Sequence, residues 1–259
     1  MDGSELKIVF WTSLVIGALL LFSLVKKEKS ERLKLFLFWG MIIPIIFTTV
    51  YLVTTTVAKN VGSVTKGPVH WHADYEIYVC GKSAKDQTSY NNHKFIPIAQ
   101  AHEGEADEAL DLVDPTGFSN RVGTSDFHEH GDGRIHVEGV VERLEDVSLG
   151  KFFEAIGGQL TKTIMRLPTN RGEVIVQNRM NCPDAKPGAW QGFVYKTKGN
   201  IVTQEKLDNF ADYVLSPYST VPPGDCIILE FGSETRAQTD KICSFYQIAI
   251  DQGELKRGY

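Results

Sequence analysis

Histidine is concentrated in one part of this chain. All seven histidines of the 259-residue sequence lie between His70 and His136, and most of them fall in two stretches, "VHWHADYEIYVC" and "FHEHGDGRIHVEG". The histidines of these stretches are His70, His72, His128, His130 and His136. Residues i and i+2 of a strand point to the same face, and neutral imidazole is the commonest nitrogen ligand for zinc and copper. The two stretches therefore predict two halves of a transition-metal site, copper or zinc, with these histidines as ligands.

The second stretch contains a turn that brings its own histidines together. The letters "GDG" at residues 131–133 indicate a hairpin of strands 124–130 and 134–141, and residues flanking such a turn face each other. His136 is therefore expected beside His128 or His130, depending on the register of the turn. Carboxylates nearby in the sequence could orient the second ring nitrogen of a ligand or ligate directly. They are Asp74, Glu129, Asp132 and Glu138.

The other candidate ligands are less suited to the site. His93 and His102 lie in a segment without strand or helix patterning and are expected at the surface. Cys80 follows the far end of the first strand, so no sulfur ligand is expected. The alternative to a metal site is a hydrogen-bonded histidine network, which could act as a pH sensor.

Two apolar segments precede the histidines. Residues 8–25 and 35–58 carry no charge, and about 20 apolar residues suffice for a membrane-spanning helix. The first segment lacks the basic start and the cleavage motif of a signal peptide. The linker between the segments holds five basic and two acidic residues, and basic loops stay in the cytoplasm. The sequence thus predicts a multi-pass protein of the cell membrane, with everything after residue 58 extracytoplasmic.

The expected organisation is a two-helix transmembrane anchor at residues 1–58, a tether at 59–68 and a β-rich domain at 69–259. Period-two alternation predicts a strand at 72–79. Further strands are expected within 161–167, 173–178, 192–197 and 226–231. A helix is expected at 148–157 with Ser148 as its cap, a helical turn within 203–215, and a helix within 239–250. Residues 83–122 are expected to form loops. This composition predicts an α+β fold with one or two short helices after the transmembrane hairpin.

The cysteines and the net charge give further indications of the cellular compartment and of the kinds of partner. Four cysteines follow the apolar segments, and disulfides persist in extracytoplasmic compartments. None is in a CxxC motif, which argues against a redox dithiol or a cysteine zinc site. Four cysteines allow three pairings, and Cys182 is expected to pair with Cys226 or Cys243. The net charge of −5 gives no support for nucleic-acid binding.

Four segments of the outer domain resemble a known family when they are taken together. "HWHADYEIYVCGK", "DFHEHGDGRIHVEGVV", "SLGKFFEAIGG" and "PPGDCIILEFG" are similar, in this order, to motifs of an uncharacterised family of bacterial and archaeal membrane-anchored extracytoplasmic proteins. That family has paired HxH motifs, then I-H-V-E, and a terminal GDxIxxxFG strand. The resemblance covers nearly all of residues 69–259. It implies the same domain organisation and no particular activity.

Three functions are compatible with this pattern. The first is a membrane-anchored protein that binds copper or zinc through its histidines. The second is an enzyme that uses the same metal, with an open coordination position, to activate water or oxygen. The third is a membrane module that binds a protein partner and in which the histidines are structural. In each case the lipid bilayer contacts the two transmembrane helices.

Overall fold

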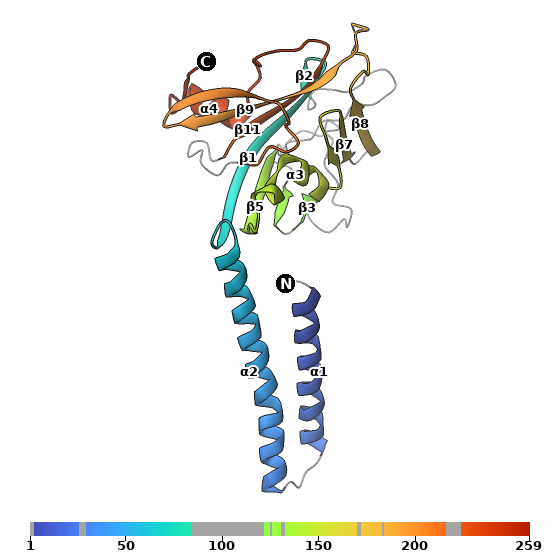
Figure 1. Cartoon of the computed structure of the whole chain (residues 1–259), viewed down its shortest axis with the longest axis vertical. Helices are drawn as coiled ribbons and strands as arrows, with labels where there is room; N and C mark the ends of the chain where they lie inside the picture. Colours follow the sequence, from blue (N-terminus) through green and yellow to red (C-terminus); the bar gives the residue numbers. More distant parts are fainter. Residues whose placement is uncertain are drawn as a thin grey trace, which may run out of the picture. The chain divides into compact units, whose positions relative to one another are not determined.

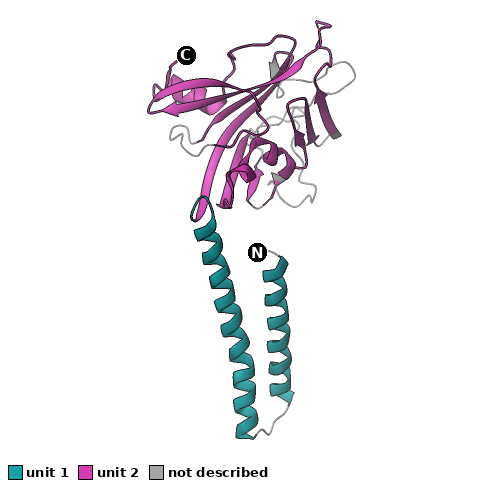
Figure 2. Ribbon diagram, in the orientation of Figure 1, with its two compact units in different colours: residues 1–66 teal, residues 67–259 magenta. Residues whose placement is uncertain are grey.

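The structure divides the chain into two units. The computed structural model describes residues 3–25, 30–83, 122–124, 126–130, 133–169, 172–182, 184–215 and 224–259. The units are residues 1–66 and 67–259 (Figure 2). His93, His102 and Asp132, and most of the loop predicted at 83–122, lie outside the described residues.

The first unit is a pair of helices, α1 (Gly3–Val25) and α2 (Glu31–Gly62), shown in blue in Figure 1. Both are long and apolar enough to cross a membrane. The two helices contact each other through a Thr12–Thr48 hydroxyl hydrogen bond of 2.8 Å and a Lys59–Glu5 ion pair of 3.3 Å. Pro44 lies inside α2, which a membrane helix tolerates.

Helix α2 is longer than the predicted membrane segment. It continues past residue 58 to Gly62, so residues 63–67 separate it from the next strand instead of the predicted tether at 59–68. The helix ends at Ser63, whose backbone is extended; its amide still donates to the Lys59 carbonyl at 2.9 Å, and its hydroxyl donates to the Asn60 carbonyl at 2.8 Å. The polar residues after position 58 therefore form the last helical turn.

The second unit is built on one large mixed sheet. In the described residues its order is β12-β10-β9-β11-β1-β5-β4-β3, with β2 paired to β1, and a smaller sheet has the order β6-β7-β8. The large sheet consists of β1 (Pro68–Val79), β2 (Lys82–Ser83), β3 (Val122–Gly123), β4 (Phe127–Glu129), β5 (Arg134–Val140), β9 (Ala189–Lys198), β10 (Ile201–Leu207), β11 (Cys226–Gly232) and β12 (Lys256–Arg257). The small sheet consists of β6 (Gln159–Leu160), β7 (Ile164–Thr169) and β8 (Gly172–Gln177). The short helices are η2 (Leu144–Val147), α3 (Leu149–Ala155) and α4 (Ser244–Asp251). The predicted α+β fold is confirmed.

Strand β1 lies in the middle of the large sheet and contributes to the packing on both of its faces. Ala73, Tyr75 and Ile77 belong to the larger core, together with α3. Tyr78 packs against the smaller core, to which α4 contributes. The predicted cap of α3 is present, since the Ser148 hydroxyl accepts a hydrogen bond from the Lys151 amide. Alternation along β1 thus assigns each side chain to one of two packed faces.

The helical turn predicted within residues 203–215 is wrong in its first half. Residues 201–207 form β10, which pairs antiparallel with β9 from Ile201↔Lys198 to Leu207↔Gly192. Hairpin pairing with the preceding strand β9 along the whole of β10 outweighs the local helix preference of "QEKL". The helix expected near the C-terminus is present as α4.

The predicted disulfide pairing is also wrong. Cys182 bonds Cys80, with a Cα–Cα distance of 5.6 Å, and Cys226 bonds Cys243 at 5.7 Å. Strands β1 and β11 are parallel, so Cys80 after the end of β1 and Cys226 at the start of β11 lie at opposite ends of the pair. Cys182 belongs to the larger core, whereas Cys226 and Cys243 belong to the smaller one. The sheet therefore separates Cys182 from both of its expected partners.

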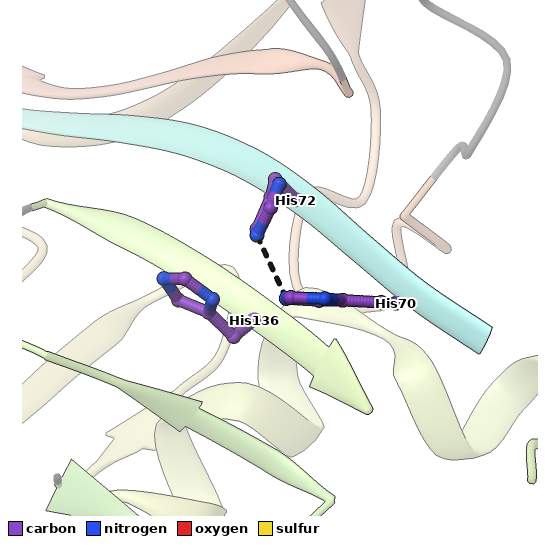
Figure 3. A group of neighbouring side chains, drawn as sticks. All are labelled: His70, His72 and His136. Carbon is purple, nitrogen blue, oxygen red and sulfur yellow. Dashed lines mark hydrogen bonds between the residues drawn. The ribbon is translucent and has the colours of Figure 1, made fainter. Parts of the chain in front are cut away.

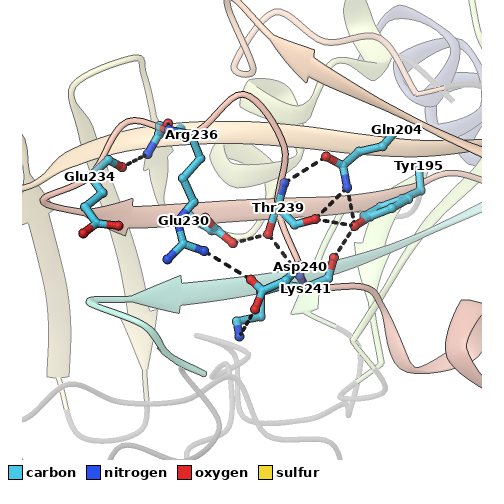
Figure 4. Close-up of polar contacts among 9 residues, drawn as sticks. Tyr195, Gln204, Glu230, Glu234, Arg236, Thr239, Asp240 and Lys241 are labelled. Atoms are coloured by element: carbon cyan, nitrogen blue, oxygen red, sulfur yellow. Dashed lines mark hydrogen bonds and ion pairs between the residues drawn. The ribbon is translucent and has the colours of Figure 1, made fainter. Parts of the chain in front are cut away.

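A polar network holds the segment between β11 and α4 against the sheet (Figure 4). The Tyr195 hydroxyl donates to the Thr239 carbonyl, and the Gln204 side chain both donates to and accepts from the Thr239 backbone at 2.8 Å. The Thr239 hydroxyl donates to Glu230, which is buried. These contacts fix the approach of the chain to α4.

Candidate metal centre

Three neighbouring strands place the histidines of both stretches on one face of the sheet. Strand β5 pairs antiparallel with β1 on one side and with β4 on the other. In this register His72 lies opposite His136, and His136 lies opposite His128. Directly opposite residues of antiparallel strands project to the same face. The two histidine stretches, expected to form two halves of one site, therefore lie on neighbouring strands.

The apolar residues between the histidines determine which face this is. Ala73, Ile135 and Val137 alternate with the histidines and are at most 1% exposed, in the larger core. Because successive side chains of a strand point to opposite faces, burying these three residues directs the histidines to the other face. The same alternation that folds the domain therefore assembles the cluster.

The ring nitrogens of the cluster are close enough to bind metal. Nε2 of His70 and Nε2 of His72 are 3.0 Å apart, and the ring centroids of His72 and His136 are 4.5 Å apart (Figure 3). On the other side of His136, its ring centroid is 4.8 Å from that of His130 and 5.5 Å from that of His128. Two nitrogens bound to one zinc ion at 2.0–2.1 Å lie roughly 3.4 Å apart in a tetrahedral site. The pairs thus need little movement to share an ion.

The ligand atoms form two triads, each within 4.8 Å. The first is His70, His72 and His136, and the second is His128, His130 and His136. His136 therefore joins both histidines of its own hairpin and also both histidines of β1. Either triad could hold a metal ion.

Exposure differs across the cluster. The His70 side chain is 58% exposed, whereas that of His128 is completely buried. Strand β3 pairs with β4 on its outer side, and Gly123 lies opposite His128. A Cβ atom on Gly123 would be 2.5 Å from the Phe127 carbonyl oxygen, so a larger residue could not bring β3 this close. One end of the cluster is open to solvent and the other is enclosed.

Of the predicted carboxylates, Glu138 belongs to the cluster. It lies opposite His70 in the sheet. Its Oε1 is 3.4 Å from Nε2 of His70 and 3.9 Å from Nε2 of His128. A carboxylate in this position can orient a ligand imidazole or complete the coordination of an ion.

The carboxylates of Asp74 and Glu129 have other roles. Asp74 Oδ1 accepts from Arg134 Nε at 2.7 Å. Glu129, between His128 and His130, is 1% exposed, and its Oε1 accepts from the Gly133 amide at 2.8 Å. This contact stabilises the turn of the hairpin. Cys80 is bonded to Cys182, in agreement with the expectation of no sulfur ligand.

Arg134 was not predicted from the sequence. It lies two residues before His136, on the same face of β5, and pairs with Asp74 in the row next to the histidines. Its guanidinium lies 4.2 Å from the centre of the Phe245 ring of α4. Glu76, further along β1, accepts from the Ser244 amide and hydroxyl at 3.2 and 3.1 Å. These contacts join β1 and β5 to α4. Arg134 could have been found from the sequence, because it lies two residues before His136 and therefore on the same face of a strand.

The features now described define a class of protein: a β-rich, disulfide-bonded domain with a histidine cluster that could hold a metal ion, preceded by two helices that could span a membrane. Comparison of the chain with family models, curated proteins and solved structures finds no match.

Proposed function

We propose that this protein binds a transition-metal ion, copper or zinc, at the histidine cluster of a domain that is anchored in the cell membrane and lies outside the cytoplasm. The observation that carries the proposal is the convergence of five histidines, four on three neighbouring strands and His130 directly after β4, with ligand atoms within 4.8 Å in each triad. Imidazole donors suit copper and zinc, whereas calcium and magnesium prefer oxygen ligands.

The location is supported by chemistry independent of the histidines. All four cysteines of the chain form disulfides, and disulfides are rare in proteins of the reducing cytoplasm. The linker between α1 and α2 is rich in Lys and Arg, which favours a cytoplasmic linker. Both arguments support a proposed extracytoplasmic location for the second unit.

A metal-dependent enzyme is the second candidate. Its support is the exposure of His70, at 58% of its side chain. Three protein ligands with a fourth position open to water is the arrangement of catalytic zinc. Such a site would activate bound water, and hydrolytic activity that depends on the added metal would distinguish it from a binding protein.

Metal analysis of the purified full-length chain in detergent tests the proposal. The protein is stripped with a chelator, titrated with Zn²⁺ or Cu⁺ against a competing chromophoric chelator, and analysed for bound metal. Stoichiometric binding is expected, with a marked loss in the double variant His128→Asn/His130→Asn. The matched control is His93→Asn/His102→Asn, which removes the two histidines that lie outside both histidine stretches of the sequence and should bind as the unmodified chain does. Substoichiometric binding by the unmodified chain, or equal losses in both variants, contradicts the proposal.

A further inference from the structure

The cluster contains two sets of ligands rather than one. We propose that it holds two transition-metal ions, one between β1 and β5 and one between β5 and β4, with His136 as the ligand that both ions share. This inference rests on the proposed metal-binding function. It adds the number of ions per chain and the residues that hold each ion.

The strand order is the first support. Neighbouring strands are about 4.8 Å apart, so β1 and β4, on opposite sides of β5, are separated by about twice that distance. Among the described residues the close groups of three ligand atoms are the two triads, and His136 is their common member. A single ion bound by both outer pairs would need their nitrogens within roughly 4 Å of one another. The grouping fits two ions better than one.

The central residue has the chemistry that this arrangement requires. Imidazole carries two nitrogens on different sides of the ring, and the His136 ring lies 4.5 Å from that of His72 and 4.8 Å from that of His130. In Figure 3 one ring nitrogen of His136 is directed toward His70 and His72, and the other is on the far side of the ring. Coordination through both nitrogens releases the ring proton to solvent. The two ions would then be about 6 Å apart, from two bonds of about 2 Å and the width of the ring.

Glu138 provides a second link between the two positions. The same oxygen, Oε1, lies within 4 Å of Nε2 of His70 in one triad and of His128 in the other. A carboxylate between two cations offsets part of their mutual repulsion. Strand β5 therefore contributes both central residues, β1 contributes one pair of histidines, and the other pair is His128 of β4 with His130 just after the strand.

Burial gives the two positions different properties. The β1 pair includes His70, which is 58% exposed, and the β4 pair includes His128, which is fully buried. A chelator in solution reaches an exposed ion more readily than an enclosed one. The ion at β1 is therefore the one that exchanges quickly, and the ion at β4 the one that is retained.

The test uses the full-length chain in detergent, loaded with Zn²⁺ or Cu²⁺. Two ions per chain are expected, and a chelator should remove them in a fast and a slow phase of equal size. The variant His70→Asn/His72→Asn should bind one ion and lose the fast phase. The variant His128→Asn/His130→Asn should bind one ion and lose the slow phase. The thermal unfolding of each variant shows whether it folds. If substitution of the buried His128 prevents folding, the variant His70→Asn/His72→Asn still decides the test.

Electron paramagnetic resonance of the Cu²⁺ form tests the role of His136. Two Cu²⁺ ions joined by one imidazole are magnetically coupled, so the integrated signal should be well below that of two isolated ions. A full, uncoupled signal from two ions refutes the shared ligand. One ion per chain that is lost in both pair variants refutes the two-ion arrangement while leaving the proposed function intact. No stoichiometric metal at all refutes the proposed function itself.

Discussion

Substitution of Phe152 should weaken both the fold and the metal site. Phe152 of α3 is fully buried, and its ring contacts those of Tyr75 on β1 at 5.4 Å and Phe127 on β4 at 5.5 Å between centroids. It thus packs beneath two of the strands that carry histidines. Strand β4 has three residues and pairs with β5 at two register positions, Phe127↔Val137 and His128↔His136. The packing of Phe127 against Phe152 therefore helps to hold His128 in place.

The magnitudes follow from these contacts. A buried Phe→Ala substitution costs about 3–5 kcal/mol, and each aromatic pair adds about 0.5–1.5 kcal/mol beyond its buried area. Phe152 makes three such pairs, the third with Phe153 at 5.8 Å. The cost of Phe152→Ala should therefore be near the upper limit, about 5 kcal/mol. Loss of the Phe127 pair alone should lower the metal affinity about two- to tenfold.

Phe153→Ala is the matched control. Phe153 is on the same helix and equally buried, and its described ring contact is with Phe152. Its substitution should cost about 3 kcal/mol and change the metal affinity less than about twofold. Urea unfolding of the full-length chain gives the stabilities, and competitive Zn²⁺ titration gives the affinities. If the two variants lose the same affinity for metal, the packing of Phe152 does not position the histidines and the reasoning is refuted.

Three other predictions test the fold and its setting. Loop-closure entropy predicts that Cys80→Ala/Cys182→Ala, across 102 residues, loses about 4.7 kcal/mol, and that Cys226→Ala/Cys243→Ala, across 17, loses about 3 kcal/mol. Non-reducing peptide mapping checks the two pairings, and a Cys182–Cys226 peptide would contradict them. A membrane-impermeant thiol reagent applied to intact cells should label a cysteine added after the C-terminus and spare Ser30→Cys, and the reverse labelling overturns the orientation. Burial and the Asp225 carboxylate, which accepts from the Tyr213 hydroxyl at 2.6 Å, raise the pKa of Tyr213. Folding therefore disfavours the ionised phenol. The contribution of Tyr213 to stability is intact below about pH 10, and the free energy of unfolding falls as the pH rises further. Tyr213→Phe should reduce this fall, and an unchanged pH profile would contradict the assignment.

Local patterns predicted the elements that carry the site. Alternation of Ala73, Tyr75 and Ile77 with polar residues identified β1, and "GDG" identified the turn between β4 and β5. Both patterns can be recognised from residues close in sequence. They also placed His70 and His72 correctly on one face of β1, because the two-residue period of a strand needs no knowledge of its partners.

Partners distant in sequence could not be predicted in the same way. The parallel pairing of β1 with β11 joins residues about 150 positions apart, and no local pattern encodes that pairing. The error in the disulfides came from this missing pairing, since it separates Cys80 from Cys226 along the strands. The strand β10 was missed for a different reason, because its residues are helix formers although its hairpin partner β9 directly precedes it in the sequence.

The central position of His136 is the part of the site that depends most on the tertiary fold. The sequence allowed His136 to join either histidine of its own hairpin, but it gave no reason to place β5 between β4 and β1. That order is what makes one imidazole a neighbour of both pairs. If β4 were beside β1 instead, the same five histidines on the same strands would bring His72 next to His128 and leave His136 at the edge. A single centre formed by the two HxH pairs would then be the natural arrangement. The order β1-β5-β4 therefore favours two linked positions over the single one that histidine spacing alone suggests.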